Sequence, residues 1–237
     1  MTESLSPYFN PVEETMSIDE LRHLQNERLK AVVNRVMSSN TYMRDYYKAA
    51  GVEAGDFRGI DDLTKLPLTS KDTFRKTYPL GLCCVDQKEI REIHQSSGST
   101  GTPVVMPYTA ADIHQWAKCM ARCYRMAGGY PGDVVQITPS FGLFNGGFGM
   151  YHGAREAELF IVPTGSGNTE RQIRMARDFN TKIITAVISY TVRIIEVLQK
   201  MSLDIPSLKI GIFGAEAVTE AMKNQIHSML GIEVYNI

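Results

Sequence analysis

A run of small and hydroxylated side chains has the composition of a phosphate-binding loop: Ser96-Ser97-Gly98-Ser99-Thr100-Gly101-Thr102-Pro103. Its glycines let the backbone adopt positive φ angles and approach a ligand closely. Successive backbone N–H groups can form an anion-binding nest, and the hydroxyls add further donors. The run is neither a Walker A loop, which has a lysine directly after its last glycine, nor a GxGxxG fingerprint. The sequence therefore predicts a phosphate site here, with a plain Ser/Gly surface loop as the alternative.

Glycines and phenylalanines are interleaved in a second cluster, Ser140-Phe141-Gly142-Leu143-Phe144-Asn145-Gly146-Gly147-Phe148-Gly149. Ligand pockets are lined mostly by apolar and aromatic side chains, and glycines leave room between such walls. We therefore expect Phe141, Gly142 and Phe144 to line a pocket for a flat, apolar group. The alternative is that the glycines serve the close packing of a helix on a sheet.

A third cluster, Gly211-Ile212-Phe213-Gly214-Ala215-Glu216, lies at the end of an apolar run that indicates a strand. In open α/β sheets, ligands bind beyond the carboxyl ends of strands, and Gly214 and Ala215 are small enough for a planar ring to lie against the backbone. Glu216 could accept a hydrogen bond or face a metal. Alternatively, it belongs to a turn and lies near the next helix, where negative charge is favourable.

Two further groups favour structural roles. The turn Pro163–Arg171 leads into a helix with Asn168 at the N-cap position, so capping is the favoured role. Cys119 and Cys123 stand four residues apart on a predicted helix near His114, a spacing at which two thiols can share a metal. No fourth ligand is evident, so we expect a partly buried helix face and no metal site.

These clusters fall between short apolar runs and longer stretches with helical periodicity. Strands are predicted at 92–95, 104–106, 134–137, 159–162, 183–187, 210–213 and 233–237, and helices at 109–127, 146–157, 168–179, 190–201 and 219–230. Such alternation is typical of mostly parallel sheets with helices on their faces. Before it, helical patterns begin with the capping box Ser17-Ile18-Asp19-Glu20. We therefore expect an α/β fold with mostly parallel sheets flanked by helices, divided into a helical N-terminal segment at 1–90 and an α/β core at 91–237.

The composition excludes several classes of protein. Lys and Arg total 25 against 26 Asp and Glu among 237 residues, so the net charge is −1 and no basic excess indicates a nucleic-acid or membrane surface. No apolar run approaches the roughly 18–20 residues of a membrane span, and the N-terminus shows no signal-peptide pattern. The four cysteines form neither a CxxC pair nor a disulfide framework. We expect a cytoplasmic protein with free thiols.

Together, the clusters resemble the phenylacetate–coenzyme A ligases, a branch of the adenylate-forming (AMP-binding) superfamily. Ser96–Pro103 is similar to the superfamily's phosphate loop, and Phe141–Gly147 is similar to the branch's Y-G-L-F-T-G-G segment. Gly165–Gln172 resembles S-G-G-N-T-E-R-Q, and Ile212–Glu216 resembles the adenine-side G-A-E motif. Tyr235–Ile237 resembles the start of Y-[DN]-I-Y-G-L-[ST]-E. Motif order and spacing agree over nearly the whole chain.

The resemblance implies an ATP-dependent reaction in two steps. Phenylacetate or a similar aryl or apolar carboxylic acid would form an acyl-adenylate with release of pyrophosphate. Coenzyme A would then take the acyl group through its thiol, with release of AMP. ATP, Mg²⁺ and coenzyme A are thus the implied cofactors and substrates, and a homodimer is an implied assembly.

The same resemblance implies roles for individual residues. The loop from Ser96 to Thr102 would hold the nucleotide phosphates. Gly214, Ala215 and Glu216 would border the adenine, with Tyr235 and Asn236 on its other side. The acyl pocket would be lined by Phe141, Gly142 and Phe144. No residue of this chain is implied as a covalent nucleophile or other catalytic group.

Members of the family are considerably longer than this chain. The parts without a counterpart here are the rest of the Y-G-L-[ST]-E motif, the aspartate that holds the ribose, and the small C-terminal domain with its catalytic lysine. We therefore expect an N-terminal portion of such a ligase, inactive on its own. Within the portion covered, Thr102 replaces the lysine that often precedes the loop proline, a change that bears on one phosphate contact. The alternatives are a catalytically incompetent nucleotide-binding fragment and an adenylating enzyme whose acyl acceptor is not coenzyme A.

Overall fold

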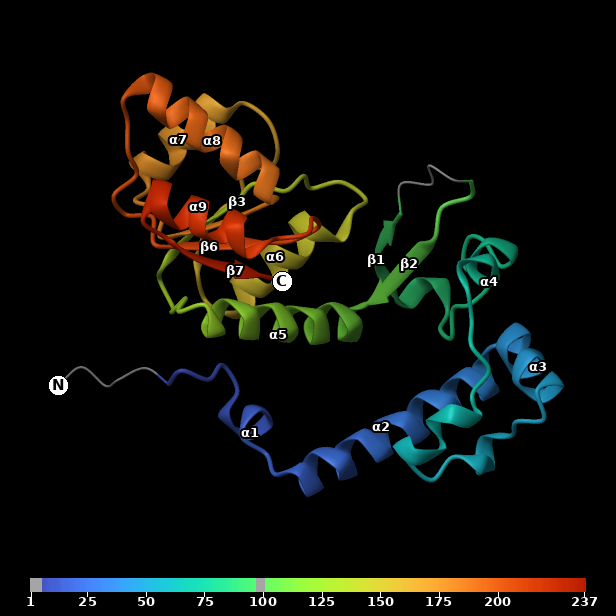
Figure 1. Cartoon of the computed structure of the whole chain (residues 1–237). Coiled ribbons are helices and arrows are strands. Elements are labelled where there is room, and N and C mark those ends of the chain that lie inside the picture. Colours follow the sequence, from blue (N-terminus) through green and yellow to red (C-terminus); the bar gives the residue numbers. More distant parts are fainter. Residues whose placement is uncertain (1–5, 97–100) are drawn as a thin grey trace. The chain divides into compact units, whose positions relative to one another are not determined.

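The computed structural model of the protein describes residues 6–96 and 101–237 (Figure 1). The chain divides into two compact units. The sheet unit contains the residues up to Pro11 together with Ala111–Ile237, and the helical unit contains Val12–Ala110. The candidate residues are therefore distributed over both units, with the phosphate loop in the helical unit and the other clusters in the sheet unit.

The helical unit contains one long helix and several short helices around a small core. The long helix is α2 (Ile18–Ser39), and the short ones are α1 (Pro11–Glu14), α3 (Thr41–Ala49), α4 (Lys71–Lys76) and the 3-10 helices η1 (Ala54–Asp56), η2 (Ile60–Lys65) and η3 (Gln87–Glu89). The predicted capping box begins α2, since the Ser17 Oγ accepts from the Glu20 N–H and the Glu20 carboxylate accepts from the Ser17 N–H. Buried Val33 and Phe57 belong to the core of this unit.

A strand hairpin completes the helical unit. β1 (Ile90–Gln95) and β2 (Val105–Thr109) pair antiparallel and form a two-stranded sheet of their own. The sequence places the start of the α/β core at residue 91, whereas the boundary between the two units falls between Ala110 and Ala111. The two positions differ because these strands bond to each other, so the hairpin groups with the helices that precede it.

The sheet unit is organised around five parallel strands in the order β4-β3-β5-β6-β7. The strands are β3 (Val134–Ile137), β4 (Phe160–Val162), β5 (Ile183–Ala186), β6 (Ile210–Phe213) and β7 (Glu233–Asn236). Their positions closely match the strands expected from the apolar runs. The α/β class with a parallel sheet is therefore confirmed.

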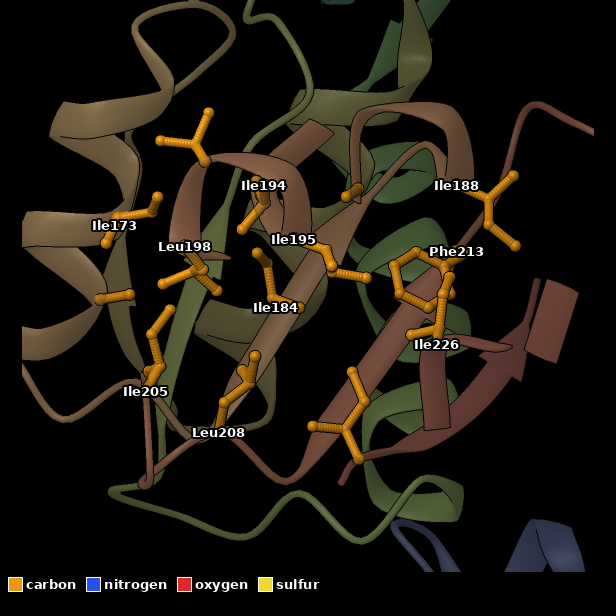
Figure 2. Packing of buried hydrophobic residues seen from close by; sticks show 14 residues of the cluster. Ile173, Ile184, Ile188, Ile194, Ile195, Leu198, Ile205, Leu208, Phe213 and Ile226 are labelled. Carbon is orange, nitrogen blue, oxygen red and sulfur yellow. The ribbon is translucent and has the colours of Figure 1, made fainter. Parts of the chain in front are cut away.

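Helices cover both faces of this sheet (Figure 1). They are α5 (Ala110–Met126) and α6 (Asn145–Glu156) on one face, and α7 (Thr169–Asp178), α8 (Ile188–Met201) and α9 (Glu220–Leu230) on the other. Because successive side chains of a strand point to opposite faces, Ile183 packs with α5 and α6 while Ile184 packs with α7 and α8. Figure 2 shows Ile194 and Leu198 of α8 close to Ile184 in the second core.

Two glycines of α6 lie against α5 without space for a larger side chain. A Cβ added to Gly153 would overlap Met120, and one added to Gly149 would overlap the ring of Trp116. A Cβ on Gly147 would likewise overlap the carbonyl oxygen of Ser140. Two of these glycines, Gly147 and Gly149, belong to the second cluster; they serve close packing, but against the Ser140 carbonyl and helix α5 and not against the sheet.

The strand order creates a topological switch point between β3 and β5. The chain passes from β3 to β4 on one side and returns to β5 on the other side of β3. In open α/β sheets, the crevice beyond the carboxyl ends of the strands at such a point is the usual ligand site. A ligand site is therefore expected among the loops that follow β3, β4, β5 and β6.

Candidate functional site

Several predicted site residues meet at the carboxyl edge of the five-stranded sheet. Phe141, Gly142 and Phe144 follow β3, and the G-A-E residues 214–216 follow β6. Tyr235 and Asn236 end β7, where Tyr235 pairs with Ile212 and Asn236 pairs with Phe213. Because parallel strands end at the same edge, residues distant in sequence come together here. The acyl and adenine candidates therefore share one edge of one unit.

The predicted phosphate loop lies in the helical unit between β1 and β2. Ser97, Gly98, Ser99 and Thr100 lie outside the described residues. The Ser96 N–H donates to the Val104 carbonyl at 3.0 Å, and the Ser96 Oγ accepts from the Val104 N–H at 2.9 Å. The Ser96 hydroxyl thus closes the base of the loop. Gly101 has φ 133°, a conformation that favours glycine, and Thr102 is exposed.

Phe141 forms an aromatic wall at the carboxyl edge. Its ring makes T-shaped contacts with Phe148 at 5.5 Å and Tyr151 at 6.1 Å between centroids. A Cβ added to Gly165 would lie 3.6 Å from the Phe141 ring, so the second cluster and the turn Pro163–Arg171 are neighbours. Phe144 is 56% exposed, so it is less enclosed than a residue that lines a closed pocket. The sequence did not single out Tyr151, which lies one helical turn after Phe148 on α6 and was identifiable by that spacing.

The turn after β4 is held to the end of β3. The Thr164 Oγ1 and the Gly165 N–H both donate to the carbonyl of Ile137, at 3.1 and 3.0 Å. Asn168 then begins α7, and its Oδ1 accepts from the Arg171 N–H at 2.9 Å. The predicted capping role of Asn168 is confirmed.

A buried pair of amide side chains holds the same turn from beneath. The Gln172 Nε2 donates to the carbonyls of Gly165 at 2.6 Å and Gly167 at 3.3 Å. The Gln136 Nε2 donates to the Gln172 Oε1 at 2.6 Å, and both glutamines are almost completely buried. Buried amides without partners are costly, so this pair fixes the turn in one arrangement. The signal in the sequence was a glutamine inside the apolar run Val134–Ile137, which we did not use.

Glu216 is bound by the first turn of α8. Its Oε2 accepts from the Ser189 N–H at 2.9 Å, and its Oε1 accepts from the Ser189 Oγ at 2.7 Å. The backbone bond, followed by the side-chain bond, holds the pKa of the Glu216 carboxyl below its usual value. The helix that it meets is α8, which precedes it in the chain, and not α9, which follows. Sequence reasoning missed Ser189, which has no motif of its own.

Gly214 and Ala215 carry the backbone of the loop after β6. The Gly214 N–H donates to the Ala186 carbonyl at 3.4 Å, and a Cβ on Gly214 would lie 3.1 Å from the Ile237 Cγ2. Ala215 has φ 67°, in the left-handed region that non-glycine residues rarely adopt. The structure therefore places the G-A-E loop beside the end of β7, while the contact of these residues with adenine remains a prediction.

Within residues 6–96 and 101–237, no group of three or more His, Cys, Asp and Glu residues is arranged to hold a metal ion. Cys119 is exposed, and burial raises the pKa of the Cys123 thiol. Over the same residues, every helix is too short or too polar to cross a bilayer.

Four curated proteins similar to this chain are named phenylacetate–coenzyme A ligases. No family model matches the chain. It is 40% identical to a phenylacetate–coenzyme A ligase of Aromatoleum evansii over 229 residues. This matched region is 96% of this chain and 52% of that ligase. A phenylacetate–coenzyme A ligase of Escherichia coli (strain K12) is 39% identical, with 94% and 52% covered. The chain thus spans about half the length of the curated relatives it matches.

Solved structures agree with the fold. A 2-hydroxyisobutyryl-CoA ligase in complex with 2-HIB-AMP and CoA superimposes on the whole chain with a TM-score of 0.91 at 25% identity, over 52% of its own length. An open conformation of the same ligase gives the same TM-score at 24% identity. Over nearly its whole length, the chain is therefore a relative of the phenylacetate–coenzyme A ligases and has the fold of the corresponding part of a coenzyme A ligase.

Proposed function

We propose that this chain is the nucleotide- and acid-binding part of an AMP-forming acid–coenzyme A ligase that activates phenylacetate or a similar aryl carboxylic acid. The observation that carries the proposal is its 37–40% identity to four phenylacetate–coenzyme A ligases over 94–97% of its length. The position of the acyl and adenine candidates at one sheet edge supports it independently.

In the proposed reaction, a carboxylate oxygen of the acid bonds to the α-phosphorus of ATP and pyrophosphate leaves. The sulfur of coenzyme A then bonds to the acyl carbon, the thiol loses its proton, and AMP leaves. Both steps depend on positioning the reactants and neutralising charge, without a covalent bond to the protein. The chain's part in them is to hold the nucleotide and the acid.

The aromatic wall of the sheet unit suits the acid. Phe141 presents a ring supported edge-on by Phe148 and Tyr151, and the buried Gln172 fixes the turn next to it. Rigid aromatic walls of this kind favour a flat apolar group over a small polar one. We infer that the acid is aromatic, with its ring near Phe141.

Among the residues that the structure describes, no group of three or more His, Cys, Asp and Glu residues is placed to hold Mg²⁺ without further ligands. Mg²⁺ prefers carboxylate and carbonyl oxygens together with the phosphates of its nucleotide. The proposal therefore assigns no residue of this chain to the metal that accompanies ATP.

Isothermal titration of the purified chain tests the proposal. We expect saturable binding of AMP, and tighter binding of a non-hydrolysable phenylacetyl-adenylate analogue, because the analogue fills both candidate sites. A chain that binds neither ligand would contradict both the proposal and the alternative of a catalytically incompetent nucleotide-binding fragment. Equal affinities for AMP and the analogue would contradict an aryl pocket in this unit while leaving the nucleotide site intact.

A further inference from the structure

We propose that Ser189 is a positioning residue that holds the Gly214–Glu216 loop in the shape needed for adenosine, acting through Glu216. The inference rests on the proposed nucleotide site and names a residue that none of the motifs contains. Ser189 lies on α8, whereas the loop follows β6, so the pair joins two elements at the carboxyl edge.

The first turn of α8 has no hydrogen-bond acceptor from its own N-cap side chain. Its N-cap residue is Val187, whose side chain cannot accept a hydrogen bond from the first backbone N–H groups. The Glu216 carboxylate supplies this acceptor, taking the Ser189 N–H at 2.9 Å and the Ser189 hydroxyl at 2.7 Å. A negative group at a helix N-terminus is also favoured by the helix dipole. Glu216 is therefore a capping group donated by a distant loop.

The loop that Glu216 anchors has a strained backbone. Ala215 adopts φ 67°, and such a conformation in a non-glycine residue persists where the surrounding structure enforces it. On one side the loop is continuous with β6, and the Gly214 N–H reaches the Ala186 carbonyl only at 3.4 Å. The two bonds to Ser189 are the stronger restraint on its other side. Removing them should let Ala215 relax.

In this arrangement the Glu216 carboxylate fixes the loop, and the loop backbone is the part that would contact the nucleotide. Since Ser189 occupies one position on each Glu216 oxygen, the side chain acts as an anchor. Gly214 lies close to Ile237 after β7, and Ala215 is exposed, so the backbone at Ala215 is left to face a planar ring there. The anchor should therefore affect recognition of adenosine and leave recognition of phosphates unchanged.

Three substitutions and two ligands separate this role from a merely structural one. Ser189→Ala removes the hydroxyl bond, Ser189→Thr retains a hydroxyl, and Ser228→Ala near the end of α9 is the matched control for loss of a serine hydroxyl. Binding of ATP and of tripolyphosphate, which has the phosphates without adenosine, is measured by isothermal titration for each variant.

We expect Ser189→Ala to weaken ATP binding by about 3- to 10-fold, the range that corresponds to the loss of one ordinary hydrogen bond. Tripolyphosphate binding should not change, and Ser189→Thr and Ser228→Ala should behave like the unmodified chain. ATP affinity unchanged in Ser189→Ala, or an equal loss for both ligands, would overturn the inference. An unmodified chain that binds no ATP would instead overturn the proposed function on which it rests.

Discussion

Replacing Phe213 with alanine should lower the free energy of unfolding by about 3–5 kcal/mol, the usual effect of removing a buried aromatic ring. Phe213 is 0% exposed and packs in the core between the sheet and helices α8 and α9, beside Ile226 (Figure 2). It is also the last residue of β6, directly before Gly214. Urea unfolding followed by circular dichroism measures the change.

The matched control is Phe160→Ala on the edge strand β4. That ring is 51% exposed and contacts mainly Phe179, at 6.0 Å between centroids. We expect a loss of about 1 kcal/mol or less there, in keeping with a half-exposed aromatic pair. Equal losses for the two substitutions would show that β6 does not form the core described for this unit.

Gly153→Ala should destabilise the sheet unit although it places a better helix former in α6. Alanine in a helix interior normally gains about 1 kcal/mol over glycine. At this position its Cβ would overlap the side chain and backbone of Met120 on α5. Overpacking of this kind typically costs about 1–3 kcal/mol, and backbone can move less readily than the end of a flexible side chain. The net effect should therefore be destabilising.

Gly146→Ala on the same helix provides the comparison. The nearest atom to its added Cβ is the Cβ of Pro139 at 3.7 Å, an ordinary contact. This variant should unfold at the same or a higher urea concentration than the unmodified chain. If Gly153→Ala also proved neutral or stabilising, the close approach of α5 and α6 would be wrong.

Local patterns were sufficient to predict most elements of the sheet unit. Strand β5 is Ile183–Ala186, a run in which every residue is buried, as expected for a parallel strand covered on both faces. Helix α7 begins after Asn168 because a side-chain acceptor at the N-cap is a local signal. Such features depend on residues close in sequence, so no knowledge of the tertiary structure was needed.

Contacts between distant residues were not predictable in the same way. Glu216 was expected near a ligand or the next helix, yet its partner Ser189 lies 27 positions earlier in the chain. The Gln136 and Gln172 amides meet across 36 positions. The motif residues were visible because of their types, whereas the residues that hold them depend on the strand order, which sets which loops become neighbours.

The central claim is that the carboxyl edge of the five-stranded sheet binds the adenosine part of a nucleotide. The most direct test is a titration of the ¹⁵N-labelled chain with AMP, followed by amide chemical shifts. We predict saturable shifts at Gly214–Glu216, which follow β6, and at Tyr235 and Asn236, which end the neighbouring strand β7. Saturable shifts confined to the hollow lined by Arg174, Leu203 and Asp204, or none at all, would contradict the account.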